Sequence, residues 1–262
     1  MRVEHLAIDG SVVSIEADGD LSTQATASGW AVVPSLMRAH PFNTYPSGHS
    51  QTVEKIIRST FKNISIESIE QYSLKGGKLR VATVTMPTAT EGKRSLVVGA
   101  WEGKKGCLTT SLIGTERDRL VEIFDTLKFS ERSRGVVIDS PVTPRPRAPE
   151  VIKEIPKLGV LGIRPAIPST LDRVPKAAGY STDHGELFRF RETSNTLLFV
   201  GESVVARIDA FAQASTGAGK SPKKGKAKQE SEASASGSPG MEQALAIAQS
   251  LRVEWVPRGS NQ

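Results

Sequence analysis

Short runs in which apolar and polar residues alternate recur along the chain, and they predict β-strands. Glycine pairs or short glycine-containing turns separate several of them, as at Gly76-Gly77 and Gly103–Gly106. Most of the chain is therefore expected to be extended. The runs are Val12–Glu16, Ile64–Tyr72, Lys78–Met86, Ser95–Trp101, Cys107–Leu112, Leu158–Arg164, Glu186–Arg191, Thr196–Val200 and Ser203–Phe211.

Apolar residues at helical spacing predict a smaller number of helices. A stripe at intervals of three and four residues marks one helix over 116–127, behind the capping pair Thr115 and Asp118. Ser50 caps a second expected helix that runs to about Phe61. A third, short helix is expected between Pro168 and Pro175.

Residues 214–240 are almost only Ala, Ser, Gly, Lys, Gln, Glu and Pro. Such a composition buries too little apolar surface to offset its ordering entropy, so a disordered insertion is expected. Beyond it, Ala244, Ile247, Ala248 and Leu251 repeat the apolar stripe Leu120, Ile123, Phe124 and Leu127 at a constant offset of 124 residues. This offset favours an internal repeat, although coincidence between two amphipathic helices would also produce it.

Together these patterns predict an α+β protein of two similar units. Each unit would be an antiparallel sheet backed by one or two helices. The first unit would span 1–135, and a proline-rich linker would follow at 136–154. The second would combine 155–213 with 241–256, because the disordered Lys/Ser/Ala/Gly insertion 214–240 precedes its last helix.

The segment Arg94–Leu127 is an apolar strand, a Gly/Lys turn, a second strand and a closing helix. With the expected helix 50–61 ahead of the sheet, this order of elements resembles the Mog1/PsbP-like fold of the DcrB and LpqN families. The resemblance covers about residues 10–130, and 155–256 if the repeat is real. It implies a binding, chaperone or accessory role, with no catalytic residues to carry over. The chain departs from many of those relatives because it lacks a signal segment or lipobox.

Charge and cysteine content narrow the classes of partner. The net charge is +6, and residues 214–240 carry five lysines against two glutamates, so half of the excess lies in the expected insertion. The remainder is only mildly basic, which argues against a dedicated nucleic-acid groove. One cysteine, Cys107, allows no internal disulfide, and no apolar run is long enough to span a bilayer. We expect a cytoplasmic protein that makes no membrane contact.

Candidate catalytic residues are few. The Pro46–His49 sequence, Pro-Ser-Gly-His, is similar to a motif of the type 2 phosphatidic acid phosphatases, but their other elements are missing. His49 or His40 could still act as a general base in a hydrolase of unrecognised type that uses the 34–50 loop. Cys107, although Lys104 and Lys105 are close, is expected to be a buried structural thiol. The histidines lack metal-ligand spacing, so neither a metal nor a cofactor is expected.

Candidate binding residues lie in three places. Arg189 and Arg191 share one face of a predicted strand and could meet an acidic partner, and Trp101 could anchor an interface. Lys220, Lys223 and Lys224 could tether a nucleic-acid-associated protein, although a plain linker is the favoured interpretation. We therefore predict a non-catalytic, cytoplasmic protein-binding adaptor or accessory module. The hydrolase and the nucleic-acid-associated protein remain as alternatives.

Overall fold

The structure, a computed structural model, describes residues 1–47, 65–87, 92–143, 147–189, 196–210 and 245–259. Strands dominate this part of the chain, and the helices are short. The elements are β1 (Arg2–Leu6), β2 (Val12–Glu16), β3 (Ala25–Val33), the 3₁₀ turn η1 (Pro34–Leu36), β4 (Arg38–Pro46), β5 (Ser65–Leu74), β6 (Gly77–Pro87), β7 (Lys93–Glu102), β8 (Gly106–Ile113), α2 (Arg117–Thr126), β9 (Phe129–Arg132), β10 (Gly135–Ile138), β11 (Val142–Thr143), β12 (Glu150–Ile155), β13 (Gly159–Pro165), α3 (Pro168–Leu171), β14 (Tyr180–Thr182), β15 (Gly185–Arg189), β16 (Thr196–Val200), β17 (Val204–Ala210) and β18 (Arg252–Val256).

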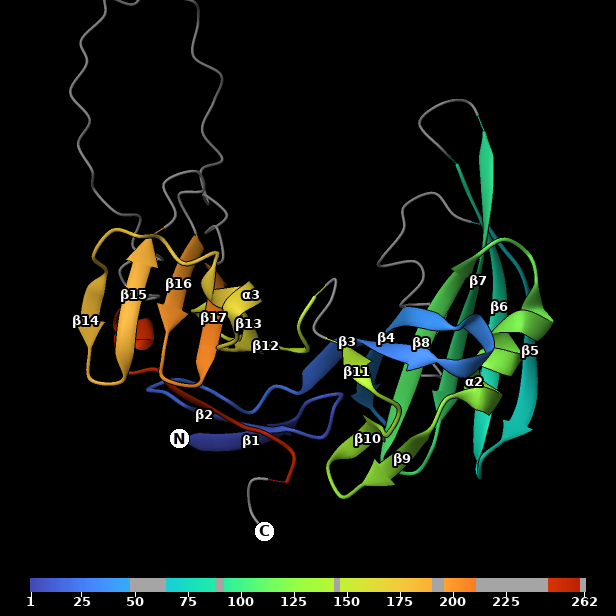
Figure 1. The fold of residues 1–262 in the computed structure, drawn as a ribbon, viewed down its shortest axis with the longest axis horizontal. Helices are drawn as coiled ribbons and strands as arrows, with labels where there is room; N and C mark the ends of the chain where they lie inside the picture. The colour runs from blue at the N-terminus through green and yellow to red at the C-terminus, as the bar shows by residue number, and fades with distance from the viewer. Residues whose placement is uncertain (48–64, 88–91, 144–146, 190–195, 211–244, 260–262) are drawn as a thin grey trace, which may run out of the picture.

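One antiparallel sheet runs through both lobes of the molecule (Figure 1). Within the described residues it has 13 strands in the order β14-β15-β16-β17-β13-β12-β3-β4-β8-β7-β6-β5, and β11 also pairs with β3. The expected α+β fold of two similar helix-backed units is therefore wrong. The alternation of apolar and polar residues correctly predicted a chain made mainly of strands. The error was to expect helices on the sheet of each half. A three-stranded sheet, and not a helix, covers the half that contains β12–β17.

Strand β3 joins the two lobes. One edge of β3 pairs with β4 from Ala27 to Val33. Its other edge pairs first with β12, where Ser28 lies opposite Glu150, and then with β11, where Ala31 lies opposite Val142. The hydrogen-bonded ladder consequently continues from one lobe into the other.

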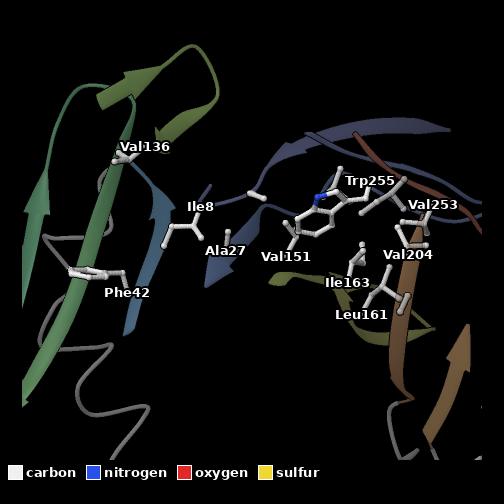
Figure 2. Packing of buried hydrophobic residues seen from close by; sticks show 14 of the residues in the cluster. Ile8, Ala27, Phe42, Val136, Val151, Leu161, Ile163, Val204, Val253 and Trp255 are labelled. Carbon is white, nitrogen blue, oxygen red and sulfur yellow. The ribbon is translucent and has the colours of Figure 1, made fainter. Parts of the chain in front are cut away.

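The lobe that contains β12–β17 is a two-layer sandwich. Its inner face is covered by a separate three-stranded sheet of order β1-β2-β18, so the first and last strands of the chain both pair with β2. Trp255 of β18 lies over Val151 and Ile163 of the main sheet (Figure 2), and it is only 4% exposed. Its backbone N–H also donates to Ser203 Oγ at 2.9 Å. Burial of this indole stabilises the contact between the two layers.

The other lobe has a helix on one face of its sheet. Helix α2 contacts β6 and β7 through Leu120, Ile123 and Phe124, which are fully buried. Gly99 of β7 makes this approach possible, since a Cβ there would lie 2.7 Å from the Phe124 ring. The hairpin of β9 and β10 lies beside β8 and β4 (Figure 1).

A single apolar cluster extends across both lobes. Figure 2 shows it running from Phe42 and Val136 through Ile8 and Ala27 to Val151. Ile8 sits at the crossing, where a Cβ on Gly29 of β3 would lie only 2.5 Å from Ile8 Cγ2. Gly29 therefore leaves the space that the Ile8 side chain fills.

Several segments differ from the sequence-based expectations. The expected loop 34–49 is instead η1 followed by the nine-residue strand β4, up to Pro46. The stretch expected as a linker, 136–154, contributes β11 and most of β12 to the main sheet. Pro141 directly precedes β11, and Pro149 directly precedes β12. The expected helix 50–61 and the expected insertion 214–240 lie outside the described residues.

The two apolar stripes have different structural roles. Leu120, Ile123, Phe124 and Leu127 are buried beside β6 and β7, and β9 follows them. Residues 245–249 are helical, and they lead into β18, which pairs with β2 near the start of the chain. The halves therefore do not share one plan.

The Ile8–Gly29 contact yields a testable double-mutant cycle. Gly29→Ala should lower the free energy of unfolding by about 1–3 kcal/mol, because its methyl group overlaps Ile8. Ile8→Ala should cost about 2–5 kcal/mol. In the double variant the two costs should fall well short of additivity, as measured by urea denaturation.

Gly19→Ala is the matched control for the cycle. A Cβ at Gly19 has its nearest neighbour at 3.6 Å, an ordinary contact distance, so this variant should change stability little. Additive losses for Gly29→Ala and Ile8→Ala would contradict the proposed contact.

Candidate functional site

Trp101, a candidate interface anchor, is part of the core. It is 2% exposed, its indole N–H donates to Leu74 O at 2.7 Å, and its ring makes an edge contact with Phe129. Gly77 and Gly103 both approach it so closely that a Cβ on either would lie within 2.6 Å of the ring. Trp101 thus locks the β5–β6 and β7–β8 turns together rather than facing a partner.

His40, a candidate general base, is buried in β4 against Phe42. Burial, reinforced by the Arg38 charge, lowers the pKa of His40 to about 4, although a hydrogen bond to the Ser111 backbone opposes this shift. Its ring is therefore neutral at pH 7, and its buried Nε2 has no hydrogen-bond partner in the described part of the chain. The geometry fits a core histidine better than a proton-transfer group.

Cys107 is fully buried at the start of β8. Burial, together with the Glu102 carboxylate, raises the pKa of its thiol to about 12, although the Arg80 charge opposes this shift. A thiol of this kind is protonated and unreactive at neutral pH.

Of the remaining candidates, the structure describes only Arg189. Arg189 is exposed at the end of β15, on the strand face that also carries the buried Leu187. His49, Arg191, Lys220, Lys223 and Lys224 lie outside the described residues. Within those residues there is no cluster of three metal-ligating side chains.

A cleft of about 590 Å³ opens beside β1, and we call it the β1 cleft. It is bordered by β1 itself, by residues 21–27 at the start of β3, by the end of β4 and by the β9–β10 turn. It therefore lies where the three-stranded sheet meets the other lobe. Strand β1 is an edge strand, since in the described part of the chain it pairs with β2 alone. Junctions of this kind are common places for ligand sites.

Cationic groups define the mouth of the β1 cleft. Arg134, in the β9–β10 turn, reaches across to Glu4 of β1 with an N–O distance of 2.5 Å. Lys105 lines the same opening from the β7–β8 turn. Its backbone N–H donates to Glu131 Oε1 at 2.7 Å, which fixes the turn.

His5, which also lines the β1 cleft, responds to this charge. Burial, together with the Lys153 and Arg134 charges, lowers the pKa of His5 to about 4. Its Nε2 is buried and lacks a hydrogen-bond partner in the described residues. A neutral imidazole held beside two cations indicates a positive local potential, which favours anionic groups in the cleft.

Lys153 supplies part of that potential from inside the sandwich. Its side chain is fully buried on the inner face of β12, and its ammonium donates to Thr23 O. Burial lowers the pKa of Lys153, whereas the Asp20 carboxylate favours its charged form. A buried ammonium with a backbone carbonyl partner is costly, and it is uncommon away from functional or polar openings.

Sequence reasoning missed the residues of the β1 cleft. Lys153 carried a usable signal, because it occupies an apolar position in the alternating run Glu150–Ile155. Arg134 and Lys105 carried none, since only the tertiary fold brings two hairpin turns to the edge of β1.

Comparison with known proteins identifies no relative. A scan of protein-family models matched none, and searches of curated proteins and of solved structures returned no match. The resemblance to the Mog1/PsbP-like fold therefore stays a prediction. Among the described helices, none combines the length and the apolar character needed to cross a membrane.

The raised pKa of Cys107 predicts an inert thiol. At pH 8 the folded protein should react with an aromatic disulfide reagent only as fast as it unfolds, because the thiol is both protonated and covered. In urea the thiol should react at once, as followed by absorbance. Rapid stoichiometric reaction of the native protein would contradict this assignment.

The lowered histidine pKa values predict acid sensitivity. As the pH falls from about 6.5 towards 4, the unfolded chain gains protons on His5 and His40 while the folded protein does not. The free energy of unfolding should therefore decrease through this window and be insensitive to these two groups above it. Urea denaturation at several pH values measures the slope.

The variant His40→Gln separates the contribution of His40 to this pH dependence from that of His5. It should be less stable than wild type at pH 7 but should lose less stability between pH 6.5 and 4, because one buried imidazole no longer titrates. Parallel curves for the variant and the wild type would argue against a lowered pKa at His40.

Proposed function

We propose that this protein is a non-catalytic adaptor or accessory module that binds another protein through the β1 cleft. The occupant is an extended, acidic segment of the partner. The observation that carries the proposal is that an edge of β1 with no pairing strand among the described residues meets the cationic groups of Arg134 and Lys105 at one opening.

The strand edge supports an extended ligand. An edge strand offers backbone N–H and C=O groups to which an incoming chain can pair. In β1 the side chains of Val3 and His5 face the sandwich interior, because they lie opposite the buried Val13 and Ile15. The outward side chain of Glu4 is the one already matched to Arg134.

The charges support an acidic ligand. Carboxylates from the partner can replace Glu4 at Arg134 and can pair with Lys105. The positions of these two cations would then fix the register in which the partner's segment lies along β1. Lys153 and Arg134 both lower the pKa of His5, which is independent support for a positive field at this point.

The catalytic alternative has less support. A hydrolase of the 34–50 loop needs an accessible base, whereas His40 is buried within β4 and its lowered pKa makes it a weak base. His49, the other candidate base, lies outside the described residues. The nucleic-acid alternative rests on Lys220, Lys223 and Lys224, outside the described residues. A cytoplasmic location belongs to the same proposal and rests on the single, reduced cysteine.

The proposal is tested by site-specific crosslinking. A photoreactive amino acid at Ser133, which lines the β1 cleft, should capture a partner that the same group at the remote, 76%-exposed Tyr180 does not. The captured protein is then purified and titrated against the wild type. The double variant Lys105→Ala/Arg134→Ala should bind it at least about tenfold more weakly, because two charge contacts are lost.

Arg252→Ala is the matched control. Arg252 is an exposed cation on β18, at the opposite edge of the same three-stranded sheet, so its loss should leave affinity unchanged. Equal binding by the double variant, or equal capture from Ser133 and Tyr180, would refute the proposal. Thermal melting of each variant checks that the fold is retained.

A further inference from the structure

A second, smaller cavity lies on the outer face of the sandwich lobe, and it shares no lining residue with the β1 cleft. Its volume is about 190 Å³. Three arginines border it: Arg164 on β13, Arg207 on β17 and Arg173 just beyond α3. We call it the arginine cavity.

A glycine keeps the floor of the arginine cavity open. Gly162 of β13 lies opposite Arg207 of β17. Because glycine has no side chain, it leaves open space beside the Arg164 and Arg207 side chains. A Cβ at Gly162 would lie 2.7 Å from Glu150 Oε1. The carboxylate of Glu150 can therefore reach Arg164, with Nη2 of Arg164 at 3.1 Å from Oε1.

Positive charge exceeds negative charge around the cavity. Arg164 is paired with Glu150, and Arg207 is paired with Asp209 at 2.8 Å. For Arg173 no ion pair exists within the described residues. Three guanidinium groups thus face two carboxylates, which leaves capacity for one further anion.

The strongest indication comes from Arg164. Its Nε–H is buried and finds no acceptor among the described residues, although its Nη2 is bound to Glu150. Buried donors on charged groups are rarely left unpaired, because desolvation without a hydrogen bond is costly. An oxygen atom of a ligand in the cavity could accept a hydrogen bond from this N–H group.

The walls restrict the rest of the ligand. Leu198 and Val205 contribute an apolar side, and they belong to a small buried cluster with Phe188. The hydroxyl of Thr170 is already engaged with Pro165 O at 2.6 Å, so it holds the wall in place. The volume of about 190 Å³ lies below the roughly 300–1,000 Å³ of pockets for drug-sized ligands, so the cavity suits a small ligand.

We infer that the arginine cavity binds a small organic acid, with its carboxylate between Arg164, Arg173 and Arg207 and its short apolar group against Leu198 and Val205. A fork of guanidinium donors suits a planar carboxylate, which it can grip with two parallel hydrogen bonds.

The test uses benzoate, isobutyrate and inorganic phosphate as probes of the full chain, with binding followed by NMR titration. Benzoate or isobutyrate should bind at one site, in the millimolar range or tighter, with shifts centred on β13 and β17. Phosphate should bind more weakly, because it makes no use of the apolar wall. Tighter binding of phosphate than of both acids would overturn the assignment of an organic acid.

Four variants locate the site. Arg173→Ala removes a cation without a partner among the described residues, so it should weaken binding about tenfold without unfolding the protein. Gly162→Ala should also weaken it, since the methyl group enters the cavity. Glu150→Gln should strengthen binding, because the competing charge at Arg164 is lost. Lys176→Ala, an exposed cation nearby that does not line the cavity, should have no effect.

The Glu150→Gln result separates ligand binding from a purely structural role. If Glu150 only stabilises Arg164, the variant should lose stability without any gain in affinity. No detectable binding of either acid, or equal losses from Arg173→Ala and Lys176→Ala, would overturn the inference.

Discussion

The shared strand β3 is the constraint on which the rest of the structure depends. It pairs with β4 along one edge and with β12 and β11 along the other, so each lobe uses the same backbone as a sheet strand. Separating the lobes would break a hydrogen-bonded ladder and expose Ile8 on Gly29. The β1 cleft, which takes its walls from both lobes, is held in one geometry for this reason.

The width of the covering sheet explains where the polar groups gather. Only three strands, β1, β2 and β18, cover the inner face of the sandwich lobe. At the β1 edge this cover ends. There the apolar, buried side chains such as Val13 give way to the partly buried His5 and the buried Lys153. A charge can be kept at such an edge because its partners, Thr23 O and the nearby Asp20, come from an open loop.

Local signals predicted much of the secondary structure but little of its arrangement. Period-two alternation bounded by glycine turns located β6, β7 and β8 within one or two residues. It failed at β3 and β4, because Ala25–Val33 is rich in small and hydroxyl side chains and Pro34 and Pro41 suggested a loop. Pairing between β2 and β18 joins residues about 240 positions apart, and no local pattern encodes it.

Arg134 of the β1 cleft and Arg164 of the arginine cavity differ in how they are solvated, and this difference decides how each would work. Arg134 has a half-exposed side chain, so salt screens it over a Debye length of about 8 Å at physiological ionic strength. Such a group raises the association rate and orients the partner more than it increases the affinity. Arg164 is about one quarter exposed and has a buried Nε–H, so a contact there is shielded from salt and its strength depends on geometry. Binding at the β1 cleft should therefore weaken steeply with added salt, whereas the contact that Arg164 makes with an anion should depend mainly on the fit of that anion.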